Sequence, residues 1–382
     1  MQKKIAVDEN TNAVKWEQFQ AYSSIFILML VAACAGFLFR SLITPGMDFH
    51  NELWAPTHLL VRGESPYDTA SLNPNLPAAW FPMAIGFFFP LGWLSETSAL
   101  QVWFAFGILA LCALILLAQP GRPTIVNTLA LALFCFFFPP VLNHFFLGQI
   151  TITVTLCLVL AAVFAMRGND WWTAFFVSMA FSKPHLAILA AFALCLHYYR
   201  IGRFKSVFLF AFRVLVMSLV LCLPLFIAYP NWIPDALEAM IQNPIWLYPS
   251  LFVVYKRNFP GWEFILWGLT LLLVLWVGWT LSKRKPLKET VYWALALAPL
   301  ASPYVGSWDF VIILPLFFLT FANADWKRQL FLAFVYLLVW AGMAFVQVQA
   351  NSDNHFFWWV PLLVVAAIAS VTNWKADKIT SP

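Results

Sequence analysis

Charge is what this sequence has least of. Only 10% of its 382 residues are Asp, Glu, Lys or Arg, whereas a soluble domain carries roughly 25%. Hydrophobic residues make up 62%, and the mean hydropathy is +0.79. The net charge of +5 comes from basic residues that form short clusters between apolar runs. The composition therefore excludes an ordinary soluble domain, and the scattered clusters argue against nucleic acid as a partner.

Other common features are missing as well. No GxGxxG stretch follows a strand-like segment, so no nucleotide-binding Rossmann unit is expected. The apolar runs lack the alternation that is typical of a membrane β-barrel. The six cysteines fall inside apolar runs and form no CxxC pair, so we expect small core residues rather than disulfides or metal ligands. Residues 1–20 are polar and charged, so no cleavable signal peptide is expected and the first span serves as an anchor.

What the chain has in abundance is long apolar segments. A helix needs about 20 mostly apolar residues to cross a bilayer, and such segments recur along the whole sequence. The predicted fold class is an all-α polytopic membrane protein with about 12 transmembrane helices. Residues 1–382 are expected to form one integral membrane domain with no separate soluble domain. Placing most of the 22 basic residues on the cytoplasmic side puts both termini inside and makes 41–80 and 229–260 extracytoplasmic loops.

Segment 81–94 leaves two topologies open. It is apolar but short, and it contains Pro82 and Pro90, so we interpret it as a half-span or a hairpin at the membrane surface. A competing topology makes it a full span and joins 171–199 into a single helix. Both topologies have about twelve spans, and the distribution of basic residues favours the first.

The predicted first outer loop, 41–80, is unusually rich in acids. It carries Asp48, Glu52, Glu64 and Asp68 in a chain that is otherwise apolar. A long acid-bearing loop after the first span is a place where a membrane enzyme can hold a catalytic carboxylate at the water interface. An ordinary solvated loop would carry the same residues, so the rest of the chain has to decide between the two.

Further polar residues gather on the same predicted side of the membrane. They are His144, Gln149, Lys183, His185, Trp308 and Asp309. Most have an ordinary explanation when taken singly, such as a helix cap for Asp309. Lys183 is harder to explain, because it lies in an apolar run beside Pro184. Ionisable residues at membrane depth are costly and usually face a cavity or a partner, and a compact lysine ammonium suits a phosphate.

A series of short motifs gives the chain a family resemblance. They are Asp48, Leu53-Trp54-Ala55 and Pro66-Tyr67-Asp68, then Trp80-Phe81-Pro82, Gly148-Gln149-Ile150-Thr151, Ser182-Lys183-Pro184, and Ser302-Pro303 with Trp308. In this order they resemble the bacterial GT-C glycosyltransferases of family 87. The sequence departs from that pattern at Leu53, where the family has Tyr, at Thr151, where it has Asn, and at Asp309, where His is frequent.

The resemblance implies a GT-C fold and a chemistry. Such an enzyme moves a sugar, mannose or an arabinofuranose, from a polyprenyl-phosphate donor to a glycan or glycolipid acceptor of the cell envelope, with inversion. It would lie in the bacterial inner membrane with its active site facing outside. Asp48 matches the family's first-loop acid and is our predicted general base, since the acceptor hydroxyl must lose a proton. Glu52 is its nearest rival, and Asp309 follows.

The remaining candidates are assigned to substrate binding. Lys183, Arg62, His144 and His185 are expected to contact the lipid phosphate, which needs positive charge or hydrogen-bond donors. Tyr67 and Trp308 are expected to stack on sugar rings. Glu52, Gln149 and Asp309 complete the predicted substrate-binding set. The sequence identifies no cofactor and leaves metal dependence open: Asp48, Glu52 and Asp68 have the oxygen ligands that a divalent cation prefers, but their spacing is not diagnostic.

Two other classes of function remain open. A polytopic transporter would show internal repeats and broken helices at mid-membrane; no clear repeat is visible, but Lys183-Pro184 fits a broken transport helix equally well. A non-catalytic partner in envelope polysaccharide assembly would carry the same spans.

Overall fold

The computed structural model describes residues 2–42, 46–68, 80–120, 123–242, 248–349 and 354–372. Within these residues the chain is helical and contains no strand. The predicted all-α class is therefore confirmed.

Six helical segments of the described chain are long and apolar enough to cross a membrane. They are Gln18–Phe37 within α1 (Gln2–Leu42), α5 (Glu96–Ala118), α10 (Pro184–Leu221), α14 (Glu263–Arg284), α17 (Trp326–Gln349), and Asn354–Val371, which joins η5 (Asn354–Trp358) to α18 (Trp359–Val371). The pair α6 (Ile125–Phe136) and α7 (Pro139–Leu147), bent by 58°, would make a seventh. A polytopic membrane protein is therefore confirmed, and the number of about twelve spans stays a prediction.

The helix α10 contains a break that the sequence predicts. Gly202 and Arg203 have non-helical backbone angles, and Arg203 has a φ of 57°. The basic residues Arg200, Arg203 and Lys205 predict a cytoplasmic turn between two spans, 184–199 and 206–228, which fall on either side of this break. Two consecutive helices are therefore merged in the 38-residue stretch.

The first of the two predicted topologies matches the helix boundaries better. Segment 81–94 forms α4 (Pro82–Phe87) and the 3-10 helix η3 (Phe89–Trp93), which are each too short to cross a bilayer. Segment 171–199 is interrupted between α9 (Asp170–Ala180) and α10. Pro184 is the first residue of α10, a position where its missing N–H costs nothing.

The two predicted outer loops are helical where the structure describes them. Segment 41–80 contains α2 (Met47–Phe49), the π-helix η1 (His50–Trp54) and α3 (Ala55–Val61). Segment 229–260 contains α12 (Trp232–Gln242) and α13 (Leu251–Asn258), after α11 (Leu223–Ala228). In the first segment Phe49, Leu53 and Leu60 recur at helical spacing and are fully buried, which explains its helices. The extracytoplasmic location of both segments stays a prediction. Residues 69–79 and 243–247 lie outside the described chain.

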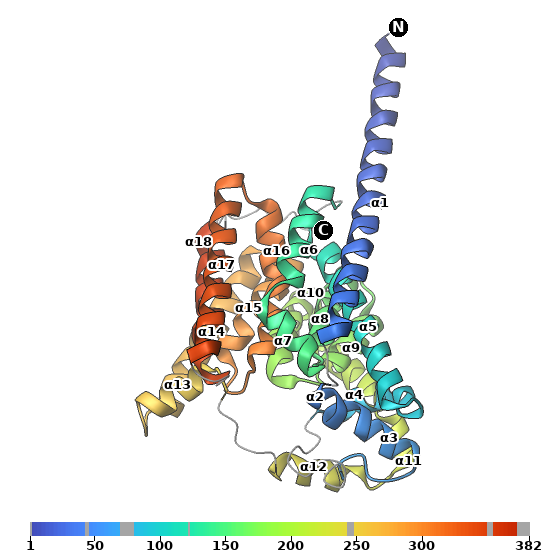
Figure 1. Cartoon of the computed structure of the whole chain (residues 1–382), viewed down its shortest axis with the longest axis vertical. Helices are drawn as coiled ribbons and strands as arrows, with labels where there is room; N and C mark the ends of the chain where they lie inside the picture. Colours follow the sequence, from blue (N-terminus) through green and yellow to red (C-terminus); the bar gives the residue numbers. More distant parts are fainter. Residues whose placement is uncertain are drawn as a thin grey trace.

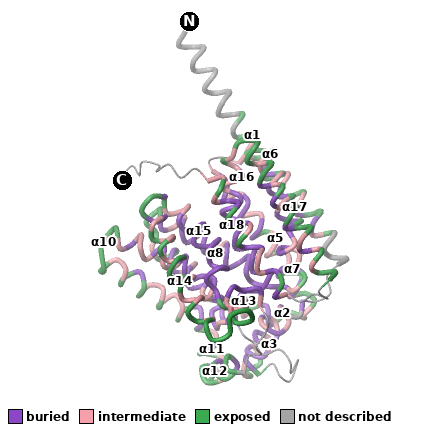
Figure 2. The backbone as a smooth tube through the Cα atoms, turned by 90° about the vertical axis from the view of Figure 1, so that its left-hand side faces the viewer, coloured by how far each residue is buried: buried purple, intermediate pink, exposed green. Residues whose placement is uncertain are grey.

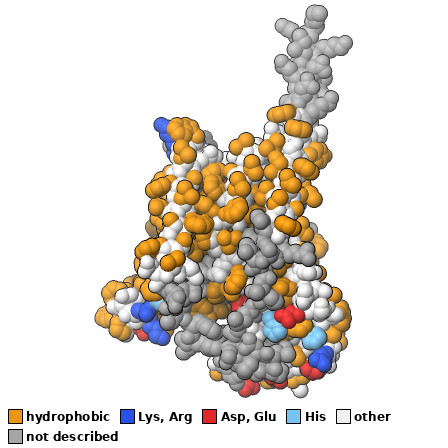
Figure 3. Space-filling view, viewed as in Figure 1, with side chains coloured by type: hydrophobic (Ala, Val, Ile, Leu, Met, Phe, Trp, Pro, Cys, Tyr) orange, Lys and Arg blue, Asp and Glu red, His pale blue; other side chains and the backbone are white. Residues whose placement is uncertain are grey.

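The helices form a bundle whose two ends differ (Figure 1). The short helices α2, α3, α11 and α12 gather at the end opposite the N-terminus of α1. The centre of the bundle is the most buried part (Figure 2), with α8 (Thr151–Met166) and α15 (Leu287–Ala301) enclosed by the other helices. The flank in Figure 3 is mostly hydrophobic, with charged side chains towards its ends, as expected for a surface in contact with lipid.

Candidate active site

Four segments that are distant in sequence meet near the end of the bundle formed by α2 and α3. They contribute Asp48 and Glu52 from α2 and η1, Gln149 and Thr151 from the turn between α7 and α8, Lys183 from the α9–α10 connection, and Asp309 from η4 (Ser307–Ile313). These segments are turns and short helices between the longer helices of the bundle.

A glycine brings the first two segments together. Gly148 ends α7 with a φ of +72°, a left-handed conformation that favours glycine. A Cβ at Gly148 would lie 2.5 Å from the Cβ of Phe49. Only glycine therefore allows the α7–α8 turn to approach α2, and this approach places Gln149 beside Asp48.

A buried ion pair forms the inner part of the site. The Lys183 ammonium donates to Asp309 Oδ1 at 2.8 Å, to Gln149 Oε1 at 2.5 Å and to Thr151 Oγ1 at 3.2 Å. Lys183 is 5% exposed and Asp309 is 1% exposed. Each of the three ammonium hydrogens therefore has an acceptor.

Asp309 is satisfied to the same degree. Besides Lys183, it accepts a hydrogen bond from Thr151 Oγ1 at 2.5 Å and one from the backbone N–H of Gly306 at 2.9 Å. A buried pair is stable only when its remaining hydrogen-bonding capacity is filled. Asp309 and Lys183 meet that condition, so the carboxylate of Asp309 is neutralised by the protein itself.

Asp48 occupies a different environment. It is partly exposed, and its Oδ2 accepts a hydrogen bond from Gln149 Nε2. Burial raises the pKa of Asp48 above its ordinary value, whereas the Gln149 bond and the charge of Lys183 oppose that increase. Asp48 is therefore linked to Lys183 through the neutral side-chain amide of Gln149 and not by a direct hydrogen bond.

Glu52 is the second acid on the Asp48 side of the site. Its Oε2 is buried and has no hydrogen-bond partner among the described residues. Burial, followed by the nearby charge of Asp48, raises the pKa of Glu52 well above its ordinary value. Glu52 therefore holds a proton over a wider pH range than an exposed glutamate.

Two histidines and two tyrosines border the acids. His185 packs edge-on against Tyr304 with ring centroids 4.8 Å apart, and Tyr304 packs against Tyr248 at 4.1 Å. The charges of Lys183 and Asp309 act on both His144 and His185. His144 Nδ1 and His185 Nε2 have no hydrogen-bond partner in the described chain, so they have capacity left for a ligand.

Three predicted site residues are not part of this cluster. Arg62 is exposed and lies 3.7 Å from Glu64. Tyr67 is buried near Cys222, away from the ion pair. Trp308 lines a neighbouring cavity instead. Arg62 and Tyr67 leave the site because α3 ends at Val61 and the chain then turns away.

The alternative of a cation site is not supported by the geometry. Among the residues that the structure describes, no three His, Cys, Asp or Glu side chains lie together as metal ligands. Asp48 and Glu52 are close to each other, but the charge of Asp68 acts on Tyr229, near α12. The proposed set of Asp48, Glu52 and Asp68 therefore does not form.

Sequence reasoning missed three contributors. Thr151 was noted only as a departure from the family pattern, yet it bonds Asp309 and Lys183. Tyr304 and Tyr248 were not singled out, although Tyr304 lies in the polar turn before Asp309. Its place between Pro303 and Asp309 was the available signal; for Tyr248 no local signal exists.

A cavity adjoins this cluster of polar residues. It has a volume of about 760 Å³ and lies between α7, η4, α17 and η5. Its lining is mainly apolar and includes Leu142, Phe146, Trp308, Trp340, Met343 and Phe357. Asn143 Nδ2 donates to Ser307 Oγ at 2.9 Å on its wall, and Ser307 is two residues from Asp309. The cavity therefore extends to η4, the helix that carries Asp309 of the ion pair.

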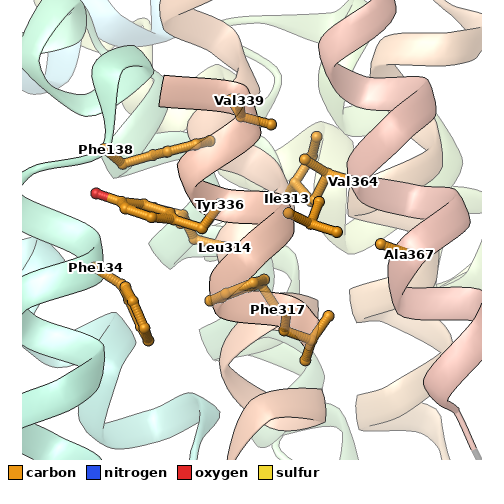
Figure 4. A pocket seen from close by; sticks show the side chains of 11 residues that line it. Phe134, Phe138, Ile313, Leu314, Phe317, Tyr336, Val339, Val364 and Ala367 are labelled. Atoms are coloured by element: carbon orange, nitrogen blue, oxygen red, sulfur yellow. The ribbon is translucent and has the colours of Figure 1, made fainter. Parts of the chain in front are cut away.

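A second cavity is too small to hold a substrate (Figure 4). It has about 20 Å³, between α6, α16 (Leu314–Asn323), α17 and α18. Phe134, Phe317, Tyr336 and Val364 surround it. This is room for about one water molecule, so it is a packing defect of the core.

Comparison with known proteins bears on the matched part of the site. A sequence model of glycosyltransferase family 87 matches residues 81–303, and no curated protein matches the chain. The match includes Gln149 and Lys183 but stops short of Asp48 and Asp309. It covers more than half of the chain and extends over the central helices. The protein therefore belongs to glycosyltransferase family 87 and is a membrane-embedded enzyme that transfers sugars.

Proposed function

We propose that the enzyme transfers a sugar, mannose or an arabinofuranose, from a polyprenyl-phosphate donor to a glycan or glycolipid acceptor of the cell envelope. Asp48 is the general base. The observation that carries this proposal is the contrast between a neutralised buried carboxylate, Asp309, and a partly exposed carboxylate, Asp48, on the two sides of Gln149.

The transfer is a single displacement. The acceptor oxygen forms a bond to the anomeric carbon while the bond from that carbon to the phosphate oxygen breaks. The lipid phosphate leaves with the bonding electrons, and Asp48 takes the proton of the acceptor hydroxyl. Attack from the face opposite the phosphate inverts the anomeric centre. The raised pKa of Asp48 makes it a stronger base than an exposed aspartate.

Lys183 stabilises the leaving phosphate in this proposal. Its ammonium already has three acceptors, so a phosphate oxygen has to replace one of them. We propose that the phosphate oxygen replaces Gln149, because Gln149 is a neutral acceptor. Asp309 is charged and is held in place by two further donors, Thr151 and the Gly306 backbone. His144 and His185 supply additional hydrogen bonds to the phosphate.

The 760 Å³ cavity supports a lipid-linked donor. It is mainly apolar and adjoins Ser307, two residues from Asp309. A polyprenyl chain in this cavity would place its phosphate towards the ion pair. Such a donor reaches the enzyme laterally through the bilayer, which agrees with the lack of a nucleotide-binding unit in the sequence.

The site is proposed to face the outside of a bacterial inner membrane. The basic clusters of the sequence lie mostly at the other end of the spans, which favours a cytoplasmic location for that end. Labelling of intact cells tests this in a cysteine-free background. Glu64→Cys should react with a membrane-impermeant thiol reagent, and Lys283→Cys should not. The reverse pattern would overturn the orientation.

Donor turnover tests the activity itself. Purified enzyme receives polyprenyl-phosphate mannose or polyprenyl-phosphate arabinofuranose together with a panel of glycan and glycolipid acceptors. We expect release of free polyprenyl phosphate that depends on the acceptor. A transporter or an assembly partner would release none with any pair, and that result would reject the proposal.

A further inference from the structure

A second polar cavity lies at the opposite end of the bundle. It has a volume of about 350 Å³, between the start of α15, the end of α16, the start of α17 and the end of α18. The polar residues of its lining are Lys285, Glu289, Thr320, Asn323, Arg328 and Thr372. Asp309 lies past the other end of α15, so this cavity is separated from the catalytic cluster by the length of that helix.

The inner cation of the cavity is deeply placed. Lys285 is 6% exposed, and its ammonium lies 3.1 Å from Glu289 Oε1 one turn along α15. Burying a lysine is costly without compensating contacts. Glu289 supplies one such contact, and the pair leaves the inner wall with polar groups of both signs.

The outer cation is accessible. About half of the Arg328 side chain is exposed, and its Nε lies 3.5 Å from Asp325 Oδ2. Asp325 also accepts from the backbone N–H groups of Lys327 and Arg328 at the start of α17. Its negative charge is therefore shared with that helix terminus, and the guanidinium of Arg328 remains available at the mouth of the cavity.

The surroundings of the cavity are strongly basic. The chain segments that border it carry six cations and two acids: Lys283, Arg284, Lys285, Lys288, Lys327 and Arg328 against Glu289 and Asp325. The lining also includes apolar side chains, among them Leu316, Leu319 and Val371. An occupant must therefore combine negative charge with an apolar part.

We propose that this cavity binds the phosphate headgroup of an anionic phospholipid. Basic pockets between transmembrane helices attract such headgroups, and each Lys or Arg near the surface contributes to the attraction. The cavity volume is several times the roughly 30 Å³ that one water occupies in the liquid. Arg328 and Lys285 contact the phosphate, Thr320 and Asn323 the glycerol part, and the acyl chains follow the apolar wall. The lipid binds independently of glycosyl transfer.

Lipid retention measured by native mass spectrometry tests the site. The wild-type protein in neutral detergent is mixed with phosphatidylglycerol, with phosphatidylcholine, or with phosphatidylglycerol and excess inorganic phosphate. We expect retention of phosphatidylglycerol over phosphatidylcholine, with little competition from phosphate. Equal retention of both lipids would overturn the proposal, and full displacement by inorganic phosphate would show a free-anion site instead.

Two variants and a control make the test specific. Arg328→Gln should lower phosphatidylglycerol affinity about fivefold, the effect of one basic side chain at an anionic surface. The double variant Lys285→Gln/Glu289→Gln keeps the net charge and should weaken binding to a similar extent. Arg257→Gln, an exposed basic residue on α13 at the other end, should have no effect. Unchanged binding in the first two variants would refute the site.

The chain's own C-terminal residues follow Thr372 directly, so the test also has to exclude them as the occupant. Deletion of residues 373–382 should leave lipid affinity unchanged. A strong gain of affinity on deletion would show that this segment fills the cavity in the intact protein and excludes the lipid, and that result would overturn the proposal. Glycosyl transfer measured beside binding keeps the two proposals separate, because none of the altered residues belongs to the catalytic cluster.

Discussion

Asp48 and Asp309 are the two ends of one hydrogen-bond chain that runs through Gln149 and Lys183, but their environments differ. Asp309 is fully buried and receives hydrogen bonds from Lys183, Thr151 and the Gly306 backbone. Asp48 is partly exposed and receives one from Gln149. A buried, neutralised pair is a poor proton acceptor, because protonating Asp309 would leave Lys183 without its counter-charge. The open carboxylate is the one that can exchange a proton with a substrate.

The comparison also explains why both regions are needed. Lys183 and Asp309 together hold Gln149 and Thr151 in fixed orientations. Gln149 in turn directs its amide nitrogen at Asp48. The buried pair of Lys183 and Asp309 therefore positions Asp48 through Gln149. Substitutions in the pair should have different consequences from substitutions of Asp48.

The largest effect is expected for Asp48→Asn. Asparagine keeps the shape of the side chain but cannot accept the proton, so turnover should fall by about 10²–10⁴, the usual contribution of a general base. Release of polyprenyl phosphate measures this. Glu64→Gln, an exposed acid of the same segment, is the matched control and should keep wild-type turnover. Full activity of Asp48→Asn would move the base to another residue.

Lys183→Met should have the next largest effect. Loss of a charged contact to the leaving phosphate should slow transfer roughly 30- to 1000-fold. It also leaves Asp309 buried without a counter-charge, which costs about 3–5 kcal/mol of stability. The double variant Lys183→Met/Asp309→Asn should therefore regain thermal stability but not activity. If activity returns with stability, Lys183 is purely structural.

Gln149→Leu should have a moderate effect with a characteristic pH signature. The hydrogen bond from Gln149 lowers the pKa of Asp48, so its removal should raise that pKa further. Since the base must be ionised, activity is lost as the pH falls through its pKa, and the acid limb of the pH–rate profile should move to higher pH. Turnover near neutral pH should fall about tenfold, because Asp48 loses the hydrogen bond from Gln149 that orients it. This is the order of magnitude that one hydrogen bond to a charged group contributes. An unmoved limb would disconnect Gln149 from the base.

Glu52→Gln should have the smallest effect on turnover, because glutamine resembles the protonated acid. The substitution should change the pH dependence of stability more than it changes turnover. The pKa of Glu52 is raised well above 4.5 in the folded protein, so the folded state binds more protons than the unfolded state above that pH. Wild-type stability should therefore decrease as the pH rises through the folded pKa, and Glu52→Gln should remove that decrease. Parallel Tm–pH curves for the two proteins would contradict the raised pKa.

Much of this arrangement could be predicted from the sequence, for a simple reason. Asp48, Gln149, Lys183 and Asp309 are polar residues at the predicted outer ends of apolar spans, and helices in a bundle bring such ends together. Lys183 was recognisable because a lysine in an apolar run needs a partner. The interpretation of 81–94 as shorter than a full span followed from its apolar length and from Pro82 and Pro90, and this segment forms two short helices.

Three aspects could not be predicted. The pairing of Lys183 with Asp309 joins residues 126 positions apart, and nothing local to either residue indicates which helices are neighbours. The separate helices α2, η1 and α3 are not predicted because they have only three, five and seven residues, too few for periodicity to define where each begins and ends. Arg62 and Tyr67 are predicted to bind the phosphate and a sugar ring because of their side-chain chemistry, which does not indicate that the chain turns after Val61 and leaves Arg62 exposed beside Glu64.

Equilibrium binding of the polyprenyl-phosphate sugar to Asp48→Asn tests the central claim most directly. If Asp48 is the open carboxylate that removes the acceptor proton, the variant should bind the donor within about threefold of the wild-type Kd while turnover is lost. Lys183→Met should show the opposite balance, with weakened donor binding. A loss of donor affinity in Asp48→Asn as large as its loss of turnover would contradict the claim, since it would make Asp48 a binding residue and not the base.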